Sequence, residues 1–188
     1  MTPSARLTLL LLLVAAPAFA LPTAAEWDQA IRTGNSNQVE AWISNAEARQ
    51  VKNSEGEWPL HLAAMYGQVG ILSRLLSFGD DLNAANEAGE TALWKAVYWG
   101  RNEALEILLP KKPDLALRYE RRATILHIAV KRNQIAALRA LLKCAPPLEE
   151  EDEDGLTPRG WAQKLKNDAA ETELRKAGAL QTKFGNSD

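Results

Sequence analysis

Apolar residues recur along this chain in two alternating patterns. Residues 60–66 carry a face of small apolar side chains that ends at Gly67, and residues 69–77 carry apolar side chains at three- and four-residue spacing until Gly79. This spacing is typical of one face of an α-helix, and a glycine that follows it is typical of a helix C-cap. The pattern predicts two short helices, preceded by a turn at Gly56.

The same order of elements returns at a fixed interval. Four segments begin 33 residues apart without an insertion: Trp58-Pro59-Leu60-His61, Thr91-Ala92-Leu93-Trp94, Thr124-Ile125-Leu126-His127 and Thr157-Pro158-Arg159-Gly160. A period of this length indicates stacked copies of one helical unit, each of which buries its apolar face on its neighbours. In the fourth copy Asn133 replaces the glycine between the helices, and asparagine also accepts a left-handed conformation.

Two flanking segments are predicted to cap the stack. Residues 27–43 keep the register with a polar first helix, and residues 154–180 open with the same turn and then become polar. Terminal repeats with solvated outer faces are expected in a finite stack. The sequence therefore predicts an all-α solenoid of about five helix–turn–helix units in residues 21–180, near 22–52, 53–85, 86–118, 119–151 and 152–180.

These residues resemble a known repeat family. The order G-x-T-P-L-H-x-A-A-x-x-G, a helix with paired leucines and G-x-D-x-N is similar to the ankyrin repeat, and residues 55–83 match it at nearly every position. Trp58 and Trp94 stand where threonine and histidine are usual, and we interpret them as packing substitutions. Arg122 replaces a hairpin glycine. The resemblance spans roughly residues 25–179, and the cysteine-poor repeat looks like a bacterial periplasmic type.

The N-terminal residues predict export. Leu7 to Ala16 is an unbroken apolar run, followed by Pro17 and by Ala18-Phe19-Ala20. This is the pattern of a signal peptide, residues 1–20, with cleavage after Ala20. An uncleaved anchor is the alternative, although the run is short for a membrane span. We expect a periplasmic protein of a Gram-negative bacterium, with no membrane insertion after cleavage and a flexible tail at 181–188.

Composition narrows the classes of partner. The chain has 22 basic and 24 acidic residues, and loss of Arg6 with the signal changes the net charge from −2 to −3. So small a charge does not favour nucleic acid or an anionic membrane as a partner. Cys144 is the single cysteine, which excludes an intramolecular disulfide. We expect it to be half-buried, with intermolecular pairing as the alternative, and we expect the free protein to be a monomer.

The residues that most often carry chemistry do not form a recognisable site. His61 and His127 lie two repeats apart, roughly 20 Å at ordinary helix spacing, too far for one metal ion. The ankyrin resemblance instead implies that they bond to hairpin backbone. The acidic run Glu149–Asp154 lacks the ligand spacing of a calcium loop, and we expect a solvated rim. We predict no catalytic residue, no metal site and no cofactor.

The resemblance implies a binding surface instead. In ankyrin stacks the hairpin tips and the exposed ends of the first helices line a concave groove that binds proteins. Adjacent aromatic side chains flanked by charges are typical of a binding hot spot. The alternative is that Tyr66 and Trp99 only cover neighbouring helices. The predicted partner-binding residues are Met65, Tyr66, Tyr98, Trp99, Lys131, Arg132, Glu57, Glu90 and Arg121.

The function that follows is non-enzymatic binding of another protein in the periplasm. An immunity protein or inhibitor of a toxin or hydrolase is one role, by fold-level analogy. A helper of a periplasmic enzyme in catalase-linked oxidative-stress defence is a second role. A secreted effector that binds host proteins is a third. An enzymatic role requires a metal ion on the acidic rim.

Overall fold

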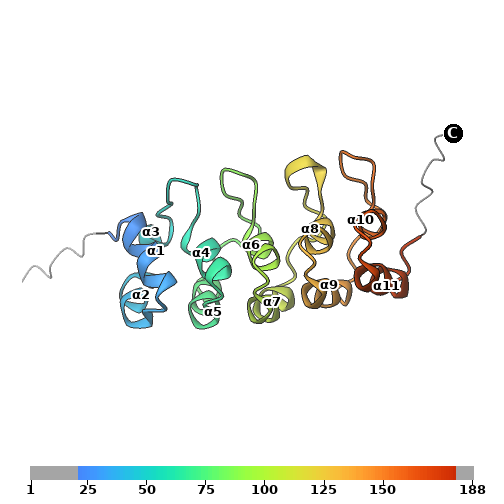
Figure 1. Cartoon of the computed structure of the whole chain (residues 1–188). Coiled ribbons are helices and arrows are strands. Elements are labelled where there is room, and N and C mark those ends of the chain that lie inside the picture. The colour runs from blue at the N-terminus through green and yellow to red at the C-terminus, as the bar shows by residue number, and fades with distance from the viewer. Residues whose placement is uncertain (1–20, 181–188) are drawn as a thin grey trace, which may run out of the picture.

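The computed structural model describes residues 21–180 of the 188-residue chain. The predicted signal peptide, with its cleavage site after Ala20, and the predicted tail at 181–188 lie outside the described residues. Within the described residues the chain is helical and contains no strand. Figure 1 shows helix pairs that stand side by side in chain order, with loops that connect successive pairs and project on the same side of the stack. The predicted all-α solenoid of helix–turn–helix units is confirmed.

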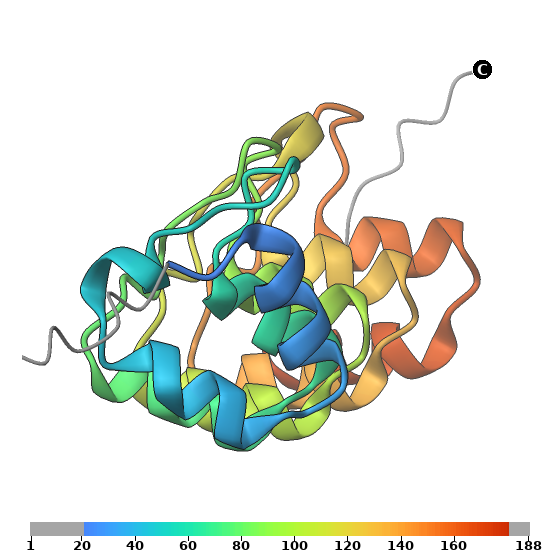
Figure 2. The same ribbon diagram turned by 90° about the vertical axis from the view of Figure 1, so that its left-hand side faces the viewer.

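Each layer contains a first and a second helix. The five pairs, called units 1 to 5, are α1 (Ala24–Arg32) with α2 (Ser36–Ile43), α4 (Pro59–Tyr66) with α5 (Val69–Ser77), α6 (Ala92–Tyr98) with α7 (Asn102–Leu108), α8 (Ile125–Lys131) with α9 (Ile135–Leu142), and α10 (Pro158–Lys164) with α11 (Asp168–Lys176). Seen along the stack, the loops of successive layers overlie one another beside the helices (Figure 2).

Three short helices interrupt the regular order: α3 (Ala46–Arg49), η1 (Leu109–Lys111) and η2 (Glu120–Arg122). The sequence pattern did not predict α3. Asn45 begins it by accepting hydrogen bonds from the backbone N–H groups of Glu47 and Ala48. The indole N–H of Trp27 donates to the carbonyl oxygen of Ala48 at 2.8 Å, which fixes α3 against unit 1. Helix α3 therefore packs at the N-terminal end of the stack.

Columns of identical side chains hold the layers together. An alanine recurs every 33 residues in the first helices of units 2 to 5, and leucines recur in the same register in the second helices of units 2 to 4. All are buried: Ala63, Ala96, Ala129 and Ala162, then Leu72, Leu105 and Leu138, then Leu75, Leu108 and Leu141. The small alanine face lets first helices approach closely, while the leucines fill the space between second helices.

The turn between the two helices of a unit needs one residue with positive φ. Glycine supplies it at Gly34, Gly67 and Gly100, with φ between 64° and 71°. Asn133 occupies the corresponding position of unit 4 with φ 54°, as predicted from its tolerance of the left-handed region. Each helix pair therefore reverses direction at the same point.

The two histidines join neighbouring units. His61 Nε2 lies 3.0 Å from the carbonyl oxygen of Ala84 and 3.1 Å from that of Glu90, and His127 Nε2 lies 2.9 Å from that of Leu156. Because carbonyl oxygens only accept, Nε2 carries the proton in both rings. Nδ1 then accepts a backbone N–H, from Trp58 or Thr124 respectively. The predicted hydrogen bonding of these histidines to hairpin backbone is confirmed.

Leu75→Ala tests the second-helix column. Leu75 is fully buried, so removing its side chain should lower the free energy of unfolding by about 2–5 kcal/mol. Chemical denaturation of the purified protein measures this change. Ser73→Ala, at an exposed position of the same helix, is the control and should leave stability nearly unchanged. A normal unfolding midpoint for Leu75→Ala would contradict the assigned core.

Acidification should weaken the folded state through the histidines. Burial lowers the pKa of His61 and of His127 below the ordinary value of 6.5, so both bind protons more readily in the unfolded chain. Their contribution to stability is complete above the ordinary pKa and is lost as the pH falls through the folded-state pKa. The melting temperature should therefore decrease between about pH 7.5 and about pH 5.5.

The matched control replaces both rings, as His61→Gln with His127→Gln. This double variant should be less stable at neutral pH, and its melting temperature should depend much less on pH over the same interval. A wild-type melting temperature that stays constant or rises on acidification would contradict the assigned protonation states.

Candidate partner-binding groove

Four closed turns form the tips of the projecting loops. A backbone N–H donates to the carbonyl oxygen four residues later in turn 2 (53–57), turn 3 (86–90), turn 4 (119–123) and turn 5 (152–156). In three of these turns the first side chain also accepts backbone N–H groups of its own turn: Asn53, Asn86 and Asp152. Turns 2, 3 and 5 are therefore built in the same way.

Turn 4 is different because it begins with Tyr119. A phenol on a rigid ring does not reach its own turn, and here its hydroxyl lies 3.1 Å from Oγ1 of Thr91 in unit 3. Arg121 and Arg122 adopt positive φ angles of 55° and 56°, where the other turns have a glycine at the position of Arg122. Turn 4 thus takes a different path from its neighbours.

Neighbouring turns are bonded in pairs. The N–H of Glu87 donates to the carbonyl oxygen of Glu55, which links turn 3 to turn 2 at 3.4 Å, and the N–H of Glu153 donates to that of Arg121, which links turn 5 to turn 4 at 3.0 Å. Among residues 21–180 no backbone hydrogen bond links turn 3 to turn 4. The buried contact between Thr91 and Tyr119 joins the two loops beneath their tips.

A cavity of about 490 Å³ lies at this unbonded junction, between units 3 and 4. We call it the groove pocket. Aromatic and aliphatic side chains form much of its surface, and charged side chains come from the turns and from the end of α8. Its lining residues are Ala88, Glu90, Trp94, Tyr98, Tyr119, Glu120, Arg121, Ala123, Ile128, Lys131 and Arg132. The pocket brings together five of the nine predicted site residues: Tyr98, Lys131, Arg132, Glu90 and Arg121.

An aromatic cluster forms one side of the groove pocket and extends beyond it. The rings of Trp94 and Tyr98 are stacked, with centroids 4.4 Å apart and planes 16° from parallel. Trp99 meets Tyr98 edge-on at 5.5 Å and is 48% exposed. The guanidinium of Arg132 lies 4.0 Å from the centroid of the Tyr98 ring, a cation–π distance. Within the cluster Trp99 is the exposed ring, while Tyr98 carries the cation on its face.

Met65 and Tyr66 lie one unit earlier and do not line the pocket. Both are half-buried. The hydroxyl of Tyr66 donates to Asp28 of α1 at 2.9 Å, and burial together with this carboxylate raises the pKa of Tyr66 to about 12. Tyr66 therefore ties units 1 and 2 together.

The structure corrects the expectation that Glu57 contacts a partner. Glu57 is 2% exposed, and its carboxylate lies 2.6 Å from Nζ of Lys95. Glu90 binds the same ammonium group at 2.6 Å. Burial disfavours the charged amine, but the two carboxylates outweigh this effect and raise the pKa of Lys95. Glu57 belongs to a buried ion-pair network between units 2 and 3 and is not part of the surface.

The acidic run Glu149–Asp154 is also less solvated than predicted. Asp152 is 4% exposed, and its Oδ2 accepts from Lys131 at 2.8 Å and from the indole of Trp161 at 2.6 Å. Although burial alone would raise it, the pKa of Asp152 falls to about 2 because these donors favour the carboxylate. Arg121 binds Glu153 and Asp154 in turn 5. Several carboxylates of the acidic run therefore form ion pairs within the protein.

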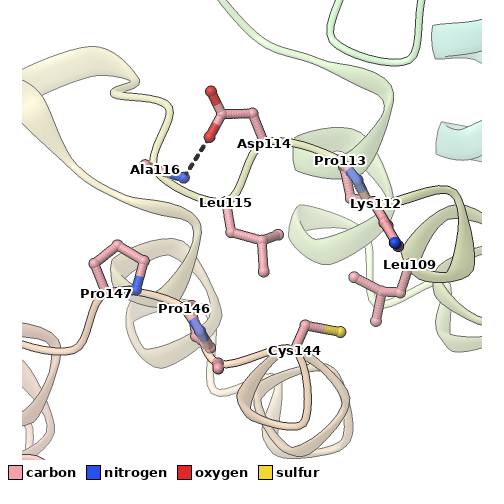
Figure 3. A pocket seen from close by; sticks show the side chains of 10 residues that line it. Leu109, Lys112, Pro113, Asp114, Leu115, Ala116, Cys144, Pro146 and Pro147 are labelled. Carbon is pink, nitrogen blue, oxygen red and sulfur yellow. Dashed lines mark hydrogen bonds between the residues drawn. The ribbon is translucent and has the colours of Figure 1, made fainter.

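A second cavity, of about 560 Å³, lies where the chain leaves α7 and α9. Figure 3 shows Leu115 directed into the space between Leu109, Cys144 and Pro146. Cys144 is exposed, which corrects the prediction that it is half-buried. Its environment contains apolar side chains and Lys112, and this cavity does not include any predicted site residue.

Residues 21–180 contain no group of three or more histidine, cysteine, aspartate or glutamate side chains placed to hold a metal ion. In the same range no helix has both the length and the apolar character needed to cross a bilayer.

Comparison with protein families agrees with the repeat geometry. Residues 27–119 match the family model described as ankyrin repeats in three copies. The chain is an ankyrin-repeat protein. A comparison with curated protein sequences found no match. Ankyrin repeats indicate a protein–protein interaction module.

The sequence alone did not identify Trp94, Tyr119 and Ile128 as parts of the site. The signal was present in the register, because Trp94 stands in unit 3 where units 2 and 4 have His61 and His127, and Tyr119 replaces the polar residue that closes the other turns. Trp94 was interpreted as a packing substitution, and it is indeed half-buried. Its stacked ring also lines the pocket. These two departures from the repeat occur at the same junction.

Lys95→Met tests the buried network of this ankyrin-repeat protein. The change leaves the carboxylates of Glu57 and Glu90 without their cation, so the free energy of unfolding should decrease by about 3–5 kcal/mol. Arg74→Met is the control, because Arg74 pairs with Glu40 at the surface, and its melting temperature should stay close to wild type. Equal melting temperatures for the two variants would show that the Lys95 network does not stabilise the fold.

Proposed function

We propose that this ankyrin-repeat protein is an exported, non-enzymatic protein of the periplasm that binds another protein through the groove. The observation that carries the proposal is the aromatic cluster of Trp94, Tyr98 and Trp99, which borders the groove pocket and leaves Trp99 48% exposed. Aromatic anchors beside a pocket with charged groups at its margin are typical of binding hot spots.

The proposed mode of binding is docking of a protruding partner segment onto a rigid surface. The layers are fixed by buried alanine and leucine columns and by hydrogen bonds between units. A surface that is already ordered loses little conformational entropy on binding, which favours affinity. Tyr98 and Trp99 would supply the apolar contact, while Arg132 would orient the partner.

Within this class we propose an immunity protein or inhibitor that blocks a toxin or hydrolase. A pocket at the centre of a rigid groove suits the capture of an exposed loop, and a captured loop is unavailable to a substrate. The predicted signal peptide supports action outside the cytoplasm. Co-purification with a toxic enzyme supports this role, whereas a peroxide-sensitive deletion strain without a toxin partner supports a helper in oxidative-stress defence.

Trp99→Ala tests the proposed surface. Because Trp99 is exposed at the end of α6, its loss should weaken binding of the natural partner roughly thirtyfold, the effect of losing about 2 kcal/mol at a hot spot. The melting temperature should be unchanged. The partner is recovered from native periplasm with the wild-type protein, identified by mass spectrometry and purified for titration calorimetry.

Phe78→Ala is the matched control. Phe78 is an aromatic residue with 39% exposure at the end of α5, away from the groove pocket, so its removal should leave affinity unchanged. Unaltered affinity in Trp99→Ala would remove the aromatic cluster from the binding surface. A cooperative loss of fold in Trp99→Ala would instead place Trp99 in the core.

A further inference from the structure

The charged groups around the groove pocket are not equally available to a partner. Lys131 is bound by Asp152, Arg121 by Glu153 and Asp154, and Glu90 by Lys95. In these intramolecular contacts each cation is matched by at least one carboxylate. Most of the charged side chains at this site therefore form ion pairs within the protein.

Arg132 is different because no carboxylate among residues 21–180 forms an ion pair with it. Its guanidinium lies over the ring of Tyr98 at 4.0 Å, and the residue is exposed. Stacking on an aromatic face orients the planar guanidinium and leaves its N–H groups available for a carboxylate. The guanidinium of Arg132 is therefore a cation held in a fixed position, where α8 ends beside the pocket.

The next unit continues the positive charge on the same side of the groove. Lys164, 33 residues after Lys131, is exposed at the end of α10 and lies 4.4 Å from the ring centroid of Trp161. No carboxylate within the described part of the chain pairs with it. The one unpaired carboxylate that lines the pocket, Glu120, belongs to turn 4 and not to the helix ends. The unpaired charges are thus positive at the helix ends and negative at the turn.

The open junction determines where a partner can enter. Turns 2 and 3 are bonded to each other, as are turns 4 and 5, whereas turns 3 and 4 have no backbone bond between them. The pocket between them has Trp94, Tyr98 and Ile128 among its lining residues, and its size suits one large side chain with its neighbours. An apolar side chain in this position would contact these three side chains and lie close to the Arg132 guanidinium.

We propose that the groove pocket receives an apolar or aromatic side chain from an exposed loop of the partner protein, and that a carboxylate next to this side chain pairs with Arg132. The inference rests on the proposed function and specifies the chemistry of the partner. The apolar group fills the space between turns 3 and 4, and the carboxylate lies at the helix end, away from Glu120. A basic loop is disfavoured there because it would face Arg132 and Lys164.

Selection of short random peptides displayed on phage tests this chemistry without knowledge of the natural partner. Peptides that bind the full mature protein should be enriched in sequences with an aspartate or glutamate next to an aromatic or large aliphatic residue. Enrichment of basic sequences, or no enrichment over an unselected library, would overturn the proposal.

Two variants connect the selected peptides to the pocket. Arg132→Glu should weaken the best acidic peptide at least about tenfold and should select peptides that carry lysine or arginine instead. Ala88→Trp, which adds bulk at the pocket lining while keeping the native contacts, should block the same peptide. Lys143→Glu makes an equal change of charge at an exposed position after α9 and should have no effect.

The outcomes separate this inference from the proposed function. If Trp99→Ala weakens the natural partner but Arg132→Glu and Ala88→Trp bind it normally, the groove binds protein and the assigned chemistry is wrong. If none of these variants alters binding of a partner that the wild type holds, both proposals fail. Melting curves of each variant distinguish the loss of binding from the loss of the folded state.

Discussion

The burial of small and large apolar side chains at repeated positions of successive layers is the constraint on which the structure depends. Alanine at one position of each first helix and leucine at two positions of most second helices fix the distance between layers, so the layers stack without an enclosing sheet or a disulfide. Side chains outside these columns are not required for packing between layers. Trp99 and Arg132 occupy one such position in successive units, and they can therefore differ without harm to the core.

Departures from the repeat are concentrated where the groove pocket forms. Trp94 replaces a histidine that elsewhere bonds the next loop, and Tyr119 replaces a residue that elsewhere closes its own turn. At this junction the hydroxyl of Tyr119 contacts Thr91, and no backbone hydrogen bond links turn 3 to turn 4 among residues 21–180. The two substitutions are best understood as one local rearrangement.

The sequence was sufficient to predict the fold because the repeat is a local pattern with a fixed period. It located the helix pairs, the left-handed Asn133 and the hydrogen bonding of the histidines. It did not predict the burial of Glu57 or Asp152, because each of these carboxylates is stabilised by a lysine from the first helix of an adjacent unit, Lys95 and Lys131 respectively. Which charges remain free depends on such contacts between units, and spacing along one chain does not reveal them.

The pairing of turns has a mechanical consequence. Turns 2 and 3 are bonded to each other, as are turns 4 and 5, so the loop side of the stack has one junction without a backbone hydrogen bond, between units 3 and 4, while the alanine and leucine columns continue through it. A small rotation near the middle of a row of layers changes the distance between its two ends more than the same rotation near one end. A group bound between turns 3 and 4 would therefore act on the curvature of the whole row.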